Sequence, residues 1–203
     1  WFPPLLFVAL LIFRTCGDVT AVKVEKSGRT WGQRKNLQFC VLWRMISGRC
    51  VTMKEKTMLA KQIESLCEGV ANPISNLANV SALLWQEFPN INWAGFYIWT
   101  NGRLELGPFQ GKPACTVIPA GKGVCGTAAG ENRTVRVADV HDFPGHIACD
   151  SASRSEIVVP IRKNGKVWGV LDMDSPVKDR FSEEDAEILE EAVRTLENTL
   201  FPY

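Results

Sequence analysis

Hydrophobic residues recur with a helical period in three segments of the chain. The first follows Glu55, and its apolar positions are Met58, Leu59, Ile63, Leu66 and Val70. The second opens at Pro73, because proline is tolerated in the first turn of a helix. Its apolar positions are Leu77, Val80, Ala82, Leu83, Leu84 and Phe88. The third begins at Ser182, which forms an N-cap signature with Asp185, and its apolar positions are Ile188, Leu189, Ala192, Val193, Leu196 and Leu200.

The region between the second and third helices has the pattern of strands. Residues 91–99 and 103–106 flank Asn101-Gly102, and residues 155–161 and 166–173 flank Asn164-Gly165. Asn-Gly between two such runs is a strong signal for a β-hairpin. Two further strands are expected at 115–118 and 134–137, with a short helix at 123–129. The pattern therefore predicts an α+β fold, in which N- and C-terminal helices cover one face of a central antiparallel sheet of about six strands.

The first 52 residues do not continue this pattern. They show no sustained helical or strand period, and their apolar run from Leu5 to Phe13 is shorter than the roughly 20 residues that a membrane-spanning helix needs. We expect an N-terminal appendage at 1–52 and one folded domain at 53–203. A membrane anchor or targeting segment in the appendage is the alternative.

Composition narrows the class of partner. The formal net charge of +1 provides no long-range field that would attract nucleic acid or an anionic membrane, so we expect a small-molecule or protein partner. Seven cysteines at irregular spacing do not suit a fully paired disulfide framework. Reduced thiols and a cytoplasmic location are the expectation.

Three glycine-rich segments between the predicted strands each carry one cysteine. Cys115 ends the segment 107–115, Cys125 lies within 121–129, and Cys149 lies within 144–150. We expect these segments to be loops, where a rigid sheet commonly presents binding and catalytic groups. The sequence thus predicts a thiol site on the sheet face that the terminal helices leave free.

These three segments, together with residues 92–97, 155–160 and 169–174, resemble the free methionine-(R)-sulfoxide reductases, a catalytic branch of the GAF fold. The resemblance extends from about Lys54 to Phe201. It implies a GAF-like fold and thiol-dependent reduction of free L-methionine-(R)-sulfoxide, with thioredoxin as the reductant and no cofactor or metal. The oligomeric state stays open, with a homodimer as one alternative.

The resemblance also implies roles for the three thiols. Cys149 matches the nucleophile, Cys115 its resolving partner, and Cys125 a third cysteine that pairs with Cys149 or serves as the nucleophile in some members. The chemistry needs such a set, because a thiolate attacks the sulfoxide sulfur and the resulting sulfenic acid condenses with a second thiol. An imidazolium at His146 would lower the pKa of a nearby thiol, although His146 is equally suited to an ordinary polar loop position.

Carboxylates and aromatic residues complete the predicted site. By resemblance, Glu156 and Asp174 match substrate-binding carboxylates, one of which doubles as proton donor, and Asp172 is expected in the same wall. The alternative is that strand alternation turns Asp172 and Asp174 to solvent. Trp93 and Tyr97 are four residues apart and share a strand face, either as an aromatic wall for the substrate or as core residues.

Two other functions compete with this interpretation. A non-catalytic GAF domain that senses a small molecule would share the fold, since a fold does not by itself determine function. Its ligand loops would not require three cysteines. A structural zinc site of Cys115, Cys125, Cys149 and His146 has the right ligand types, but their spacing contains no Cys-x-x-Cys pair.

Overall fold

The computed structural model describes residues 57–147 and 149–202. The expected appendage at 1–52, the start of the domain at 53 and the alternative anchor therefore lie outside the described residues. Among the residues that are described, no helix is long and apolar enough to cross a membrane.

Three helices form where the hydrophobic period predicts them: α1 at Met58–Cys67, α2 at Pro73–Glu87 and α4 at Glu183–Leu200. The Ser182 side chain accepts from the Asp185 N–H while the Asp185 side chain accepts from the Ser182 N–H, so the expected N-cap is a complete capping box. The predicted face of α1 is partly wrong. Met58 and Leu66 are exposed, and the buried positions are Leu59, Ala60, Ile63 and Cys67.

Six strands form one fully antiparallel sheet in the order β3-β2-β1-β6-β5-β4. Their bounds are β1 Trp93–Thr100, β2 Arg103–Gly111, β3 Val117–Pro119, β4 Val135–Val137, β5 Ser155–Lys163 and β6 Lys166–Ser175. Both predicted hairpins are present. The loop expected at 107–115 is wrong over its first part, because β2 continues to Gly111 and pairs with β1 as far as Trp93. The strand expected at 115–118 is shorter and begins at Val117.

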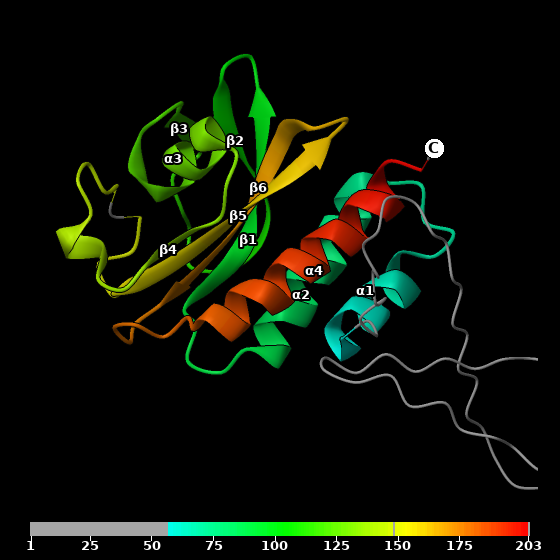
Figure 1. The fold of residues 1–203 in the computed structure, drawn as a ribbon, viewed down its shortest axis with the longest axis horizontal. Coiled ribbons are helices and arrows are strands. Elements are labelled where there is room, and N and C mark those ends of the chain that lie inside the picture. The colour runs from blue at the N-terminus through cyan, green and yellow to red at the C-terminus, as the bar shows by residue number, and fades with distance from the viewer. Residues whose placement is uncertain (1–56, 148, 203) are drawn as a thin grey trace, which may run out of the picture. The chain divides into compact units, whose positions relative to one another are not determined.

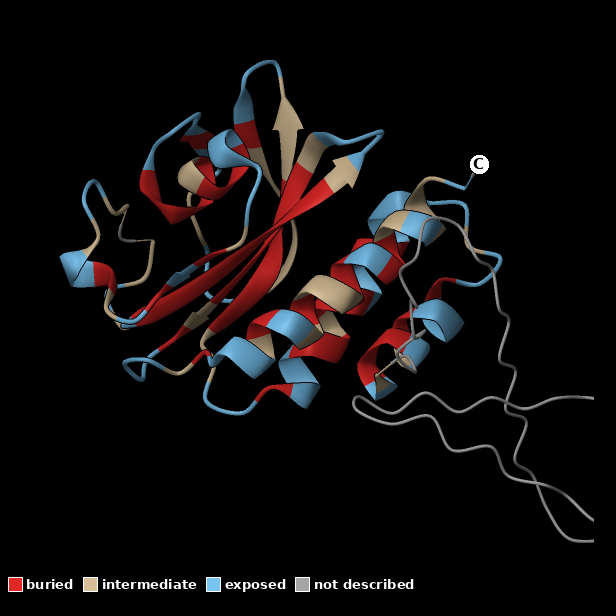
Figure 2. Ribbon diagram, viewed as in Figure 1, coloured by how far each residue is buried: buried red, intermediate tan, exposed pale blue. Residues whose placement is uncertain are grey.

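The sheet separates two apolar layers. Helices α2 and α4 pack against one face with α1 beside them, whereas the short helix α3, Gly123–Glu131, lies on the other face (Figure 1). Buried residues concentrate along the central strands and on the inward sides of these helices (Figure 2). Successive residues of β1 point to opposite layers, so Phe96 belongs to the layer of the terminal helices and Tyr97 to the layer of α3. The predicted α+β arrangement is confirmed.

Strand register on the α3 side aligns the polar residues of the candidate site. Glu156 on β5 is directly opposite Asp174 on β6, and Asp174 is directly opposite Trp93 on β1. Two residues before Asp174 on β6, Asp172 lies between Val158 on β5 and Gly95 on β1. Because positions two apart on a strand share a face, all three carboxylates project toward the side where α3 packs.

Candidate active site

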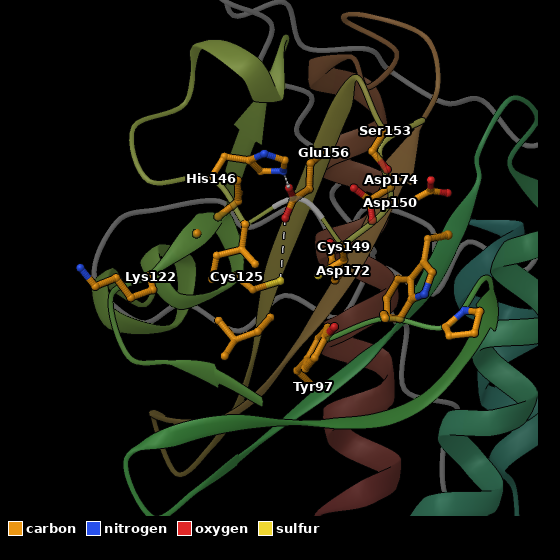
Figure 3. A pocket seen from close by; sticks show the side chains of 17 residues that line it. Tyr97, Lys122, Cys125, His146, Cys149, Asp150, Ser153, Glu156, Asp172 and Asp174 are labelled. Carbon is orange, nitrogen blue, oxygen red and sulfur yellow. Dashed lines mark hydrogen bonds and ion pairs between the residues drawn. The ribbon is translucent and has the colours of Figure 1, made fainter. Parts of the chain in front are cut away.

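A pocket lies between this sheet face, the start of α3 and the segment after Pro144 (Figure 3). Its walls include polar, sulfur-containing and aromatic side chains. The residues that line it are Trp93, Tyr97, Pro113, Ala114, Ile118, Lys122, Gly123, Val124, Cys125, His146, Ile147, Cys149, Asp150, Ser153, Glu156, Asp172 and Asp174. Every site residue predicted from the sequence is in this set except Cys115, which contacts Cys149.

Three of the carboxylates that line the pocket, those of Glu156, Asp172 and Asp174, are held where ionisation is costly. Glu156 and Asp172 are each 6% exposed. Burial, reinforced by the negative charges of Asp172 and Asp174, holds the pKa of Glu156 well above its usual range. Burial raises the pKa of Asp172 to about 7, and burial together with Asp172 raises the pKa of Asp174. The interpretation of Asp172 as a solvent-facing residue is therefore wrong, and near neutral pH the cluster retains protons.

Cys149 and Cys115 form a thiol pair at the edge of the pocket. Their Sγ atoms lie 2.7 Å apart, although the two residues are 34 positions apart in the sequence. Burial and the neighbouring Cys115 thiol raise the pKa of Cys149 to about 12. The Cys149 thiol is consequently protonated in the empty pocket and has to lose its proton when it reacts.

Cys125 occupies a different part of the same pocket. It lies in the first turn of α3, is 3% exposed, and its Sγ is 3.8 Å from Oε1 of Glu156. Burial and the charges of Asp172 and Glu156 hold its pKa well above the usual value. A thiol that is buried beside carboxylates is a poor spontaneous nucleophile.

His146 lies beside a carboxylate of the pocket. Its Nε2 lies 3.8 Å from Oε2 of Glu156. Burial lowers the pKa of His146, with a smaller contribution from His141. An imidazolium that lowers a thiol pKa is therefore not favoured in the empty site.

Aromatic rings form the wall opposite α3. Trp93 stacks on Tyr97 with ring centroids 5.8 Å apart, and it also stacks on Phe109 with ring centroids 5.2 Å apart. The rings are anchored by their polar ends: Trp93 Nε1 donates to the Lys112 carbonyl and Tyr97 Oη donates to the Cys115 carbonyl. The two predicted aromatics therefore contribute both to the pocket and to the core, and Phe109 joins them.

Sequence reasoning missed a polar group at the rim. Asn92 Nδ2 donates to Asp150 Oδ2 at 3.1 Å and to Ser153 Oγ at 3.0 Å, and Lys112 forms an ion pair with Asp150 at 3.2 Å. These contacts hold the segment that carries Cys149 against the start of β1. Their positions in the sequence could have pointed to these residues. Asn92 directly precedes Trp93 and Asp150 directly follows Cys149, and both lie inside the segments that carry the resemblance.

Comparison with known proteins identifies the family. The GAF domain model matches residues 62–200. A protein named free methionine-R-sulfoxide reductase from Escherichia coli is 50% identical over 142 residues, which cover 70% of this chain and 86% of that protein. The chain belongs to the free methionine-R-sulfoxide reductase family of GAF-domain proteins.

Solved structures of this family have the same architecture. A structure of fRMsr of Staphylococcus aureus in complex with substrate is 53% identical, with a TM-score of 0.68, and covers 75% of this chain and 99% of that one. The free methionine-R-sulfoxide reductase of Neisseria meningitidis in complex with its substrate is 46% identical, also with a TM-score of 0.68, and covers 70% and 86%. The predicted family and the GAF fold are both confirmed.

Proposed function

We propose that this chain reduces free L-methionine-(R)-sulfoxide to L-methionine, with Cys149 as the nucleophile and Cys115 as the resolving thiol. The observation that carries the proposal is the 2.7 Å separation of their Sγ atoms at the edge of a pocket that contains buried carboxylates. Two supports come from relatives. One is named for this reaction, and another was solved in complex with its substrate.

The proposed reaction balances with two thiols. The Cys149 sulfur attacks the sulfoxide sulfur and forms a sulfur–sulfur bond to the substrate. This bond and the sulfur–oxygen bond of the substrate then break as the oxygen moves to Cys149, so that Cys149 becomes a sulfenic acid and methionine leaves. The Cys115 sulfur then attacks this sulfenic acid, so a disulfide forms and the oxygen leaves as water. Two thiols and one sulfoxide thus give one disulfide, one sulfide and one water. Thioredoxin, the reductant in this proposal, restores the thiols by exchange.

The carboxylate cluster supplies the proton and the binding charge. Since the pKa of Asp172 is raised to about 7, a proton is available near the sulfoxide oxygen at neutral pH. Glu156 or Asp174 pairs with the substrate ammonium, and this positive charge in turn favours the ionised carboxylate. The substrate ammonium also partly offsets the negative charge of the carboxylates, which opposes formation of a thiolate in the empty pocket. Trp93 and Tyr97 provide an aromatic wall for the methyl group and the developing positive sulfur.

The thiol roles are tested by single turnover without external reductant. Cys149→Ser should form no methionine, because a serine hydroxyl does not ionise near neutral pH. Cys115→Ser should form about one methionine per site and then stop with sulfenic acid on Cys149, as expected when the resolving thiol is missing. Peptide mapping after sulfenic-acid trapping locates the modified residue. An adduct on Cys125 in the unmodified protein would reverse the assignment of nucleophile.

Substrate selectivity provides an independent test of the carboxylate role. N-acetylation removes the substrate ammonium, so N-acetylmethionine sulfoxide and the (S) epimer of free methionine sulfoxide should both react poorly. Glu156→Gln or Asp174→Asn should impair turnover while the circular dichroism spectrum stays unchanged. Equal rates on the free and the acetylated substrate would contradict the pairing of the ammonium with this cluster.

A further inference from the structure

One group of ligand-type atoms in the pocket includes the Cys125 thiol, to which the proposed reduction gives no role. Cys125 Sγ and one carboxylate oxygen from each of Glu156 and Asp172 lie within 4.8 Å of one another, and all three residues are buried. They come from α3, β5 and β6, so the fold and not a local turn brings them together. In Figure 3 the Cys125 and Glu156 side chains point toward each other, and His146 approaches Glu156 from the other side.

A second observation indicates a missing ligand. Asp172 Oδ1 is buried and has no hydrogen-bond partner in the structure. A buried carboxylate oxygen without a partner is costly, and such an atom is commonly satisfied by a ligand or an ion. Asp172 is only 6% exposed and lines the pocket. Its unpaired oxygen is therefore available to a group that enters this cavity.

We propose that Cys125, Glu156 and Asp172 form an inhibitory site for Zn²⁺, with His146 as the fourth ligand. Zinc bonds of about 2.3 Å to sulfur and about 2.1 Å to oxygen at a tetrahedral angle separate the two ligand atoms by about 3.6 Å. The observed separation of Cys125 Sγ and Glu156 Oε1 is 3.8 Å. His146 Nε2 lies 3.8 Å from the second oxygen of Glu156 and outside the group of three close ligand atoms, so in this proposal the imidazole turns toward those atoms when the ion binds.

The chemistry of the ligands selects the kind of cation. A thiolate and an imidazole favour Zn²⁺ over Mg²⁺ and Ca²⁺, which prefer oxygen ligands alone. On binding, the Cys125 thiol gives its proton to solvent and its sulfur bonds to zinc, so no oxidation or reduction occurs. The positive ion neutralises the negative charges of the thiolate and the two carboxylates, which burial and mutual repulsion otherwise make unfavourable. It differs from the structural zinc site considered from the sequence, because Cys115 and Cys149 are not ligands.

The inhibitory part of this inference rests on the proposed function. A zinc ion on Glu156 and Asp172 occupies the carboxylates that would receive the substrate ammonium and donate the proton. Zinc and methionine-(R)-sulfoxide should therefore exclude one another. The reductase would be inactive while zinc is bound and would recover when a chelator removes the ion.

Cobalt substitution tests the site without an activity assay. The full chain, reduced and freed of metal, is titrated with Co²⁺, and the thiolate-to-cobalt absorption in the near ultraviolet is recorded together with a competition for Zn²⁺ against a chromophoric chelator. Cys125→Ser should remove one equivalent of this absorption, and Asp172→Asn should weaken Zn²⁺ binding by about 10-fold or more. Cys115→Ser serves as the matched control and should keep the absorption of the parent chain.

Two results would overturn the proposal. If Cys125→Ser keeps the full absorption while Cys115→Ser or Cys149→Ser loses it, the ion binds at the other thiol pair. If the ion binds at Cys125 but methionine-(R)-sulfoxide does not raise its apparent Kd, the site is not inhibitory. A chain that binds cobalt through Cys125 yet shows no reductase activity would contradict the proposed function and leave the metal site supported.

Discussion

Replacing Asp172 by asparagine should stabilise the folded protein, although it removes a group of the proposed active site. Asp172 is buried on β6 beside two other carboxylates, and one of its oxygens has no partner. Burial raises its pKa to about 7. The folded state therefore binds a proton more tightly than the unfolded state does, and stability is lost as the pH rises from the unfolded pKa toward the folded pKa.

The size of this effect follows from the pKa difference. The pKa of Asp172 is about 7 in the folded protein, and that of an unfolded aspartate is about 3.9, where one unit corresponds to about 1.4 kcal/mol. Ionising Asp172 thus costs the folded state roughly 1 to 2 kcal/mol at pH 5 and about 4 kcal/mol at pH 8. Asp172→Asn avoids this cost and also relieves repulsion of Glu156 and Asp174. Its free energy of unfolding should exceed that of the parent chain by these amounts, with the larger gain at pH 8.

Urea denaturation of the reduced proteins at several pH values between 4 and 8 measures the difference. Glu68→Gln is the control, because Glu68 is an exposed carboxylate just after α1 and its replacement should leave the pH dependence of the parent chain unchanged. Equal stability of Asp172→Asn and the parent at pH 8, or parallel pH profiles, would refute the reasoning. Such a result would mean that water or a counter-charge already solvates the Asp172 carboxylate.

Three further substitutions test how the site is supported. Gly95→Ala should lower the free energy of unfolding, measured in urea, by about 1–3 kcal/mol, because a Cβ at Gly95 would lie 2.3 Å from the Cβ of Phe109. Unchanged stability would show that Phe109 can move away at little cost. Tyr97→Phe removes the 3.1 Å hydrogen bond to the Cys115 carbonyl and should cost about 1 kcal/mol. It should also slow disulfide formation in stopped-flow single turnover, and an unchanged rate would contradict a positioning role. Ser182→Ala breaks the capping box of α4 and should cost about 1 kcal/mol in thermal unfolding while single turnover stays normal.

The predicted elements that depend on local signals agree with the structure. The two Asn-Gly turns adopt positive φ at both residues, 50° and 83° at Asn101-Gly102 and 52° and 76° at Asn164-Gly165, so the hairpins could be located from the sequence. The capping box of α4 is equally local. Because such signals act over a few residues, neither needs knowledge of the rest of the chain.

Errors arose where strand pairing or packing outweighed local composition. Residues 107–111 contain two glycines and a proline and suggest a loop. They form the end of β2 because β1 offers partners along its whole length and a register shift between Gly95 and Tyr97 absorbs the irregularity. On α1, the residues that meet α2 and α4 are decided by how the helix rotates against its neighbours. This rotation leaves Met58 and Leu66 exposed.

The candidate site shows the same division between what is local and what is tertiary. The sequence by itself determined which residue types are present, the alternation that places Trp93 and Tyr97 on one face, and the family whose motifs they match. Only the tertiary structure brought Cys115 within 2.7 Å of Cys149 and aligned Glu156, Asp174 and Trp93 across three strands. It also turned His146 toward Glu156 and buried Asp172. The physical reason is that thiol and carboxylate pKa values depend on desolvation and on charges from distant segments of the chain. The burial of these groups and the distances between them are decided only when the register of the sheet brings those segments together.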